Sequence, residues 1–412
     1  MTTKHSLRQW VTISNEQHKE RPIWWTVYDH ETQLSTKFNF KADALLFKRT
    51  LPHATAYFHW YEDELARLNW SVEPTESCVE LRKQRAHELR NTYNYIRLWY
   101  SGGPDSHTAL MSFVNNNVYI DEIVILLYPD NKATNVADTT ANEVMIAAFP
   151  QLKQIINLIP NTKITIVEAS ENDINHWFSG LTDNNKIPCF DALDGDLAQF
   201  HLDISWGISK VLGQTNKKNW CDIHGGSKVK LFKNKDKWYS YFVDTNLSTF
   251  YVQANSEDFF ISRTIPNLYL KTVYNLKNYH TMMNSTDQQV NGIYADTTKH
   301  IEYNNAMGRE TVHPISTIKL YHTTHNLAQW NNLMVSGAKS MQFYNNVIST
   351  AQGQTWYKNH IETQRFLIEE YSEFWNRDAD NNIVPYLGYK GHLSTFYCLN
   401  DGKTYNSTQV GF

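Results

Sequence analysis

Residues 95–114 read YIRLWYSGGPDSHTALMSFV, and this stretch decides the fold. The apolar run 95–100 predicts a buried strand, and residues 107–114 predict a helix. Between them lies a turn, Ser101-Gly102-Gly103-Pro104-Asp105-Ser106, whose two glycines permit positive φ and a close approach to a ligand. A strand, a glycine turn and a helix start in this order predict a phosphate-binding loop, because the free N–H groups and the dipole of a helix N-terminus attract anions.

The polar side chains of this turn fit that hypothesis. Ser101 and Ser106 offer hydroxyl donors to phosphate oxygens, and Asp105 and Ser106 stand where side chains are expected to cap the helix. An acid beside phosphate is explained by a magnesium ion, which prefers carboxylate and phosphate oxygens together, so Asp105 is the expected Mg²⁺ ligand. The alternative is a plain capped turn, since Gly-Gly and Asp-Ser are common turn residues.

The chain after the turn alternates between strand and helix patterns. Strands are expected at 122–128, 163–168 and 219–224, and helices at 137–148 and 197–212. This alternation predicts an α/β fold, a Rossmann-like, doubly wound parallel sheet. Ligands of such sheets bind beyond the carboxyl ends of the strands, which is where the glycine turn lies.

A second glycine-containing turn follows the last of these strands. It reads His224-Gly225-Gly226-Ser227-Lys228 and falls on the same edge of the sheet as the first turn. His224, Gly225, Ser227 and Lys228 are therefore candidate contacts to phosphate or to a second substrate. The alternative is a tight turn into a β-hairpin, which is expected between residues 230 and 243.

The motif SGGPDS at 101–106 resembles the pyrophosphate-binding motif of the N-type ATP pyrophosphatases, or PP-loop enzymes, which have a HUP-like, adenine nucleotide alpha hydrolase-like fold. Within that family, the chain most resembles asparagine synthetase-like proteins. The resemblance implies an enzyme that uses ATP and Mg²⁺ and cleaves ATP to AMP and pyrophosphate. The activated acceptor is then attacked by ammonia or an amine. It also implies that adenine lies against Leu127 and Tyr128, with Asp105 and Ser106 as catalytic residues and His107 near the phosphates.

Two alternatives remain open within this resemblance. One is a nucleic-acid base-modifying enzyme, such as a tRNA thiolase or a 7-cyano-7-deazaguanine synthase relative, and the other is a nucleotide-binding module without chemistry. Residue 2 is Thr and the first cysteine is Cys78, so an N-terminal cysteine glutaminase is not expected and a separate ammonia donor is a candidate partner. Cys189 and Cys221 keep sulfur transfer open, although Cys221 lies mid-strand and is expected in the core.

Composition limits the remaining possibilities. Hydrophobic residues make up 41% and charged residues 19% of 412 positions, as in a globular protein, and the net charge of −4 gives no global attraction to nucleic acid. The four cysteines form no CxxC pair, so a structural zinc site is not expected. Without a signal-like or transmembrane-length apolar run, a cytoplasmic protein that does not contact membranes is expected.

Three segments are expected along the chain. Residues 1–94 form an N-terminal α+β extension, 95–245 the PP-loop ATP-binding domain, and 246–412 a mainly helical region that shapes the site for a small-molecule or nucleobase acceptor. Further predictions at finer scale are a strand at 23–28 and helices at 41–48, 59–67, 75–91, 268–283, 325–335 and 355–375, with Thr75 as a candidate N-cap of the helix at 75–91. Candidate acceptor contacts in the last segment are Lys271, Arg309 and Lys390, each of which also fits a structural charge.

Overall fold

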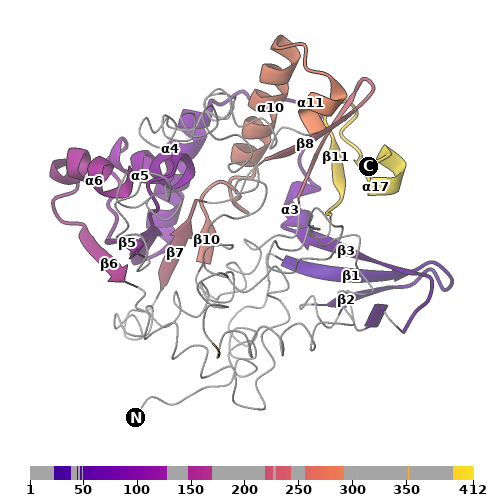
Figure 1. Cartoon of the computed structure of the whole chain (residues 1–412), viewed down its shortest axis with the longest axis horizontal. Coiled ribbons are helices and arrows are strands. Elements are labelled where there is room, and N and C mark those ends of the chain that lie inside the picture. The colour runs from indigo at the N-terminus through magenta and orange to yellow at the C-terminus, as the bar shows by residue number, and fades with distance from the viewer. Residues whose placement is uncertain are drawn as a thin grey trace.

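The described residues form three sheets, of which the largest is a five-stranded parallel sheet (Figure 1). The computed structural model describes residues 23–38, 44, 47–48, 50–127, 147–168, 219–225, 229–242, 256–291, 306, 351 and 393–412, and these are the described residues. The strands of the sheet are β4 (Tyr95–Trp99), β5 (Glu122–Leu127), β6 (Lys163–Glu168), β7 (Trp220–His224) and β10 (Ser256–Asp258).

The strand order β10-β7-β4-β5-β6 makes the sheet doubly wound. The chain starts in the middle at β4, proceeds outward through β5 and β6, and returns on the other side of β4 as β7. This reversal creates a topological switch point between β4 and β7, and every pair of neighbours is parallel. The predicted Rossmann-like α/β class is confirmed. The sequence did not predict β10, because Ser256-Glu257-Asp258 is short and polar and carries no apolar run.

One face of the sheet is apolar and is covered by helices. Alternate residues of β4, β5 and β7 pack against α4 (Cys78–Thr92) and α5 (Pro104–Val114), which lie side by side in Figure 1. The residues that β4, β5 and β7 contribute to this face are Ile96, Leu98, Ile123, Ile125, Cys221 and Ile223. A further helix, α6 (Phe149–Ile155), joins the same core through Leu152 and Ile155.

Helix α4 begins at Cys78, two residues after the start that an N-cap at Thr75 would give. Thr75 was the expected N-cap, but Ser77 caps the helix in a reciprocal capping box with Glu80. The box satisfies two backbone donors at once, which a Thr75 cap would not do. The N-cap prediction was therefore wrong, and the helix predicted at 75–91 is confirmed.

One row of residues on the opposite face of the parallel sheet is polar from edge to edge. The strand register places Lys163, Glu122, Arg97, Asp222 and Ser256 in one row, each opposite the next. Arg97 and Glu122 are completely buried and Asp222 almost so. Strands of parallel sheets are usually apolar on both faces, so this row is a costly feature that must be compensated by pairing.

Two antiparallel sheets complete the described structure. The first has the order β2-β1-β3 and consists of β1 (Ile23–Asp29), β2 (Ser35–Phe38) and β3 (Ala54–Trp60). The second has the order β12-β11-β9-β8 and consists of β8 (Lys230–Asn234), β9 (Lys237–Tyr241), β11 (Phe396–Cys398) and β12 (Thr404–Tyr405). The predicted strand at 23–28 and the predicted β8–β9 hairpin are both confirmed.

The helix expected at 59–67 is mostly wrong. Residues 54–60 form β3, which pairs with β1 along seven residues and buries Phe58 and Trp60. Tyr61 then takes a left-handed conformation with φ 46°, and only Glu62–Leu65 forms a short helix, α3. Pairing with β1 outweighs the local helix propensity of this stretch.

One aromatic core joins segments that are far apart in the chain. Trp60 contacts Phe242, and the ring of Trp70 stacks on Tyr397 at a centroid distance of 4.3 Å. Helix α10 (Asn267–Met282), predicted at 268–283, contributes Tyr269 to the same core. The hairpin pairs with β11 through Tyr397 and Cys398, and β10 belongs to the parallel sheet, so strand pairing crosses the expected border at residue 245.

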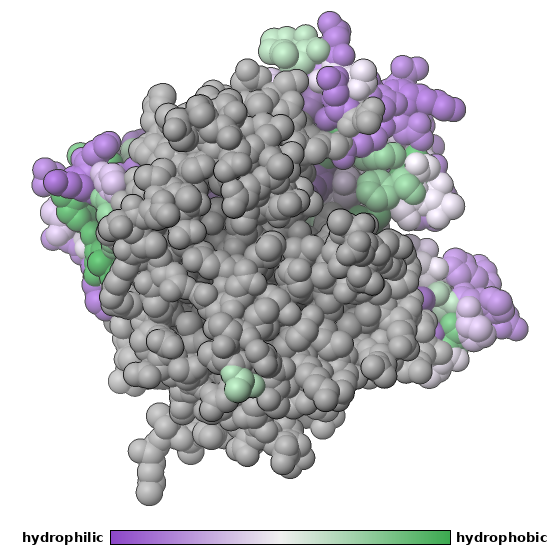
Figure 2. All heavy atoms as spheres, in the orientation of Figure 1, coloured by the Kyte–Doolittle hydropathy of each residue, from purple (hydrophilic) through white to green (hydrophobic). Residues whose placement is uncertain are grey.

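Two short helices lie close to the second sheet, α11 (Asp287–Asn291) and α17 (Ser407–Val410). Figure 2 shows mainly hydrophilic residues around α10 and α11 at its upper right. No helix in the described ranges is long and apolar enough to cross a membrane. The helices expected at 197–212, 325–335 and 355–375, and most of those at 41–48 and 137–148, lie outside the described residues.

Candidate functional site

The glycine turn at 101–106 connects β4 to α5 at the carboxyl edge of the sheet, beside the switch point. Its groups bond to one another: Ser101 N–H donates to Ser106 Oγ at 3.3 Å, and Ser106 Oγ donates to the Gly103 carbonyl at 3.2 Å. The Gly103 N–H donates to Ser101 Oγ at 3.2 Å. Both predicted serines therefore lie within one tight loop, with Ser106 buried.

Gly102 is required by the shape of the loop. It has φ +78°, and a Cβ there would lie 2.6 Å from the Ala148 Cα, next to the start of α6. No other residue fits both the left-handed backbone and this close approach.

The N-terminus of α5 opens directly onto the loop. Gly103 is the N-cap and Pro104 occupies the first turn, and no side-chain cap is present within the described residues. The expectation that Asp105 or Ser106 caps the helix was wrong, because Ser106 Oγ turns back to the Gly103 carbonyl instead. The first N–H groups of α5 and its dipole are therefore directed at the loop, as an anion site requires.

The turn after β7 lies against the first turn, as its place on the sheet predicted. A Cβ on Gly225 would lie 3.0 Å from the Asp105 carbonyl oxygen and 3.2 Å from the Ser106 Cα. Gly225 thus allows the two turns to touch across the switch point.

The ring of His224 stacks on Trp99, the last residue of β4, with an interplanar angle of 12° and centroids 5.9 Å apart. Below them, the Arg97 guanidinium lies between the rings of Trp99 and Trp220, at 5.6 and 5.3 Å. Arg97 also holds Asp222 with two hydrogen bonds of 2.5 and 2.6 Å. Burial raises the pKa of the Asp222 carboxyl, although the guanidinium lowers it.

The polar row continues through Glu122, which accepts hydrogen bonds from Tyr95 at 2.8 Å and from Thr165, and pairs with Lys163 at 3.0 Å. Burial raises the pKa of Glu122, but these donors outweigh it and the net pKa is lowered. The row that contains Arg97 and Asp222, two residues before Trp99 and His224 on their strands, therefore consists of paired charges.

The side chain of His107 is partly buried and hydrogen-bonded rather than free on the surface. Its Nδ1 is 2.9 Å from the Tyr100 hydroxyl, which donates to Gln151 Oε1 on α6 at 3.0 Å. Gln151 Nε2 in turn donates to the Gly102 carbonyl at 3.3 Å. Burial lowers the pKa of His107 to about 4, so its imidazole is neutral at pH 7. Gln151 was not predicted, because no local pattern marks a residue 49 positions from the loop it contacts.

Asp105 is the one predicted metal ligand. It is half-buried in the first turn of α5. No three His, Cys, Asp or Glu side chains converge as a metal-binding group within the described ranges. A single carboxylate fits Mg²⁺, which is commonly held by one or two carboxylates plus the phosphates of its substrate.

The remaining predicted residues are placed only in part. Leu127 ends β5 at the carboxyl edge of the sheet, and Lys271 bonds Glu73 at 2.6 Å and the Pro74 carbonyl at 3.0 Å, which joins α10 to the segment before α4. Cys221 is completely buried, and burial raises the pKa of its thiol well above the usual value. Tyr128, Ser227, Lys228, Cys189, Arg309 and Lys390 lie outside the described residues.

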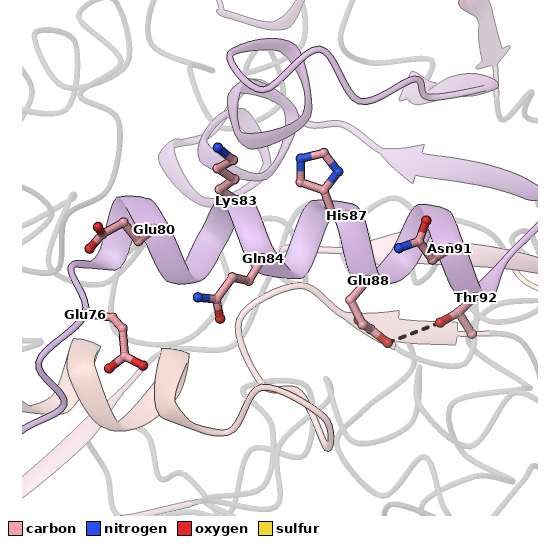
Figure 3. Close-up of a pocket in the computed structure, with 8 residues that line it drawn as sticks. All are labelled: Glu76, Glu80, Lys83, Gln84, His87, Glu88, Asn91 and Thr92. Carbon is pink, nitrogen blue, oxygen red and sulfur yellow. Dashed lines mark hydrogen bonds between the residues drawn. The ribbon is translucent and has the colours of Figure 1, made fainter.

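A surface groove of about 670 Å³ runs along α4 and is lined by polar side chains (Figure 3). Its lining consists of Glu76, Glu80, Lys83, Gln84, His87, Glu88, Asn91 and Thr92. None of these was predicted as a site residue, and the groove contains no part of the glycine turns. The switch point between β4 and β7 is the candidate site.

No protein-family model matches the chain, and no curated protein matches it closely in sequence. Among solved structures it is similar to NMN synthetase from Francisella tularensis, at 12% identity and a TM-score of 0.27, over 61% of this chain and 95% of that one. It is also similar to NH3-dependent NAD synthetase from Campylobacter jejuni subsp. jejuni NCTC 11168 in complex with the nitrate ion, at 13% identity and a TM-score of 0.27, over 59% and 96%. The fold class rests on the strand order of the parallel sheet itself.

Proposed function

We propose that this protein is an ATP-dependent enzyme that cleaves ATP to AMP and pyrophosphate and thereby adenylates an acceptor, in the manner of PP-loop ligases. The observation that carries the proposal is the loop 101–106 at the switch point, where two turns touch through Gly225 and the uncapped N-terminus of α5 opens. Donors grouped at such a point stabilise the charge of a leaving pyrophosphate.

The roles of the residues follow from their positions. Ser101, Ser106 and the Gly103 N–H bind the β and γ phosphates, and Asp105 binds the Mg²⁺ that accompanies them. When bound, the metal supplies positive charge at the departing oxygens. Leu127 lies at the carboxyl end of β5, where adenine would rest, and Tyr128 follows it.

The second substrate is proposed to enter over the turn after β7. His224 and Gly225 lie beside the loop, and Ser227 and Lys228 follow them in the sequence. We propose an acceptor activated for attack by ammonia or an amine, in the style of asparagine synthetase, with nitrogen free in solution or delivered by a separate donor. Sulfur transfer through Cys221 is disfavoured, because a buried thiol with a raised pKa forms little thiolate.

The proposal is tested with ATP labelled in the α phosphate, Mg²⁺ and a fractionated metabolite extract. Formation of AMP and pyrophosphate supports it. Asp105→Ala should reduce the rate at least 100-fold, the scale seen when one key electrostatic group is removed from an active site. Asp236→Ala is the matched control, because Asp236 is an exposed carboxylate in the β8–β9 turn.

Each alternative has its own result in this assay. ADP as the product contradicts adenylation. ATP binding without turnover in any fraction supports a binding module. Turnover that depends on the RNA fraction alone, rather than on small molecules, supports a nucleic-acid base-modifying enzyme.

A further inference from the structure

The peptide between Gly102 and Gly103 is held from behind by helix α6. Its carbonyl oxygen accepts a hydrogen bond from Gln151 Nε2 at 3.3 Å, and Gln151 is buried with 7% of its surface exposed. In a trans peptide the carbonyl and the N–H point in opposite directions. Fixing the Gly102 carbonyl toward α6 therefore directs the Gly103 N–H away from α6, to the side where Ser101 Oγ accepts it.

The direction of every hydrogen bond in this group can be assigned. The Gly102 carbonyl can only accept, so Gln151 must face it with its amide nitrogen and present Oε1 to Tyr100. The Tyr100 hydroxyl has one hydrogen, which it donates to Oε1 of Gln151, so His107 Nδ1 must donate to the Tyr100 oxygen. His107, Tyr100 and Gln151 thus form a single directed chain that ends on the Gly102 carbonyl.

This chain matters because the peptide has a glycine on each side. Glycines have no Cβ to oppose a rotation of the peptide plane, and a rotated plane would point the Gly102 carbonyl at the phosphates instead of the Gly103 N–H. In the observed orientation Gly102 has φ +78° and Gly103 has φ −71°. A carbonyl dipole turned toward a phosphate would repel it.

We propose that Gln151 is a positioning residue for the pyrophosphate site, which selects the orientation of the Gly102–Gly103 peptide that donates to the anion. This inference rests on the proposed function and adds a determinant to it that lies outside the motif. Gln151 does not touch the phosphates. It acts through the peptide plane, and Tyr100 and His107 act through Gln151.

The test measures binding of Mg²⁺-pyrophosphate and of AMP to the full chain by calorimetry. Gln151→Leu should weaken pyrophosphate binding about tenfold or more, because one donor is lost and a carbonyl dipole is free to replace it. AMP binding should change less than twofold, since AMP carries neither of the phosphates that the loop holds. Gln154→Leu is the matched control, because Gln154 lies on the exposed side of the same helix.

Tyr100→Phe is a second, milder variant, in case Gln151→Leu fails to fold. It keeps Gln151 but removes the hydroxyl that orients its amide, and a loss of about threefold for pyrophosphate alone is expected. Equal affinities for pyrophosphate in the wild type and both variants would overturn the inference, as would a parallel loss of pyrophosphate and AMP binding. If the wild type itself binds no pyrophosphate, the proposed function fails; if it binds but Gln151→Leu binds equally well, the inference alone fails.

Discussion

Replacing Asp222 by Asn is expected to destabilise the parallel sheet strongly. Asp222 is 1% exposed and its two carboxylate oxygens hold the completely buried Arg97 guanidinium at 2.5 and 2.6 Å. The amide removes the negative charge and leaves the guanidinium buried without its counter-charge. Breaking one partner of a buried pair costs about 3–5 kcal/mol.

The size of the effect follows from the pair's position in the sheet. Arg97 and Asp222 are register partners on β4 and β7, the two central strands that flank the switch point. For a unit of 150–250 residues, 1 kcal/mol lowers Tm by about 2–4 °C, so a fall of roughly 6–20 °C is expected. The loss should be visible in the first transition recorded by scanning calorimetry at pH 7.

A double variant separates the charge from the packing. Arg97→Met with Asp222→Leu removes both charges and keeps side chains that pack between the Trp99 and Trp220 rings. Because an apolar pair often equals or exceeds a buried ion pair in stability, the double variant should recover most of the lost Tm.

The exposed Asp236→Asn is the control for loss of one carboxylate and should leave Tm unchanged. Two results would refute the reasoning. One is a Tm for Asp222→Asn within about 3 °C of the wild type, which corresponds to roughly 1 kcal/mol. The other is a double variant that melts no higher than Asp222→Asn.

Three further predictions concern the loop, its surroundings and the buried thiol. Gly102→Ala should destabilise the protein more than Gly402→Ala and should abolish pyrophosphate binding. Both glycines have positive φ (+78° and +72°), but only at Gly102 would a Cβ lie within 3 Å of other backbone atoms, so melting curves of the two variants isolate the effect of that contact. The pKa of His107 is about 4 in the folded protein, so between pH 4 and about 6.5 the unfolded chain binds a proton at this residue that the folded protein does not. The free energy of unfolding therefore rises with pH across that window, by about 3 kcal/mol in total, and His107→Gln should flatten this part of the pH profile measured by urea unfolding. Cys221 should resist iodoacetamide in the native protein and react in urea, as peptide mass mapping would show, and rapid native labelling would contradict its burial.

The sequence predicted those parts of the fold that depend on continuous local patterns. The apolar run before the glycine turn became β4, and residues 122–127 and 163–168 became β5 and β6, because each segment carries apolar or β-branched residues at most positions. The sequence also predicted that the two glycine turns lie at the same edge of the sheet, since parallel strands bring their carboxyl ends to one edge, and in the structure the two turns are in contact.

Other parts depend on contacts between distant residues and could not be predicted from local patterns. The helix predicted at 59–67 wrongly included the last two residues of β3, because the strand character of β3 comes from pairing with β1, about 30 residues away. β10 is three polar residues that become a strand only through pairing with β7. No sequence pattern around Gln151 indicates that it contacts the loop, because the two are 49 residues apart in the chain and meet only in the folded structure.

The second antiparallel sheet has a consequence for the order in which the protein acquires its structure. β9 ends at Tyr241, but its neighbour β11 begins at Phe396, so the ribosome must add more than 150 residues before this edge can be paired. At 5–20 residues per second, that interval lasts roughly 8–30 seconds. All five strands of the parallel sheet are synthesised by Asp258, so the layer that holds the site can assemble while β9 is still an open edge. The nascent chain can therefore pass through a stage in which the loop at 101–106 is formed but an unpaired strand is exposed to other chains.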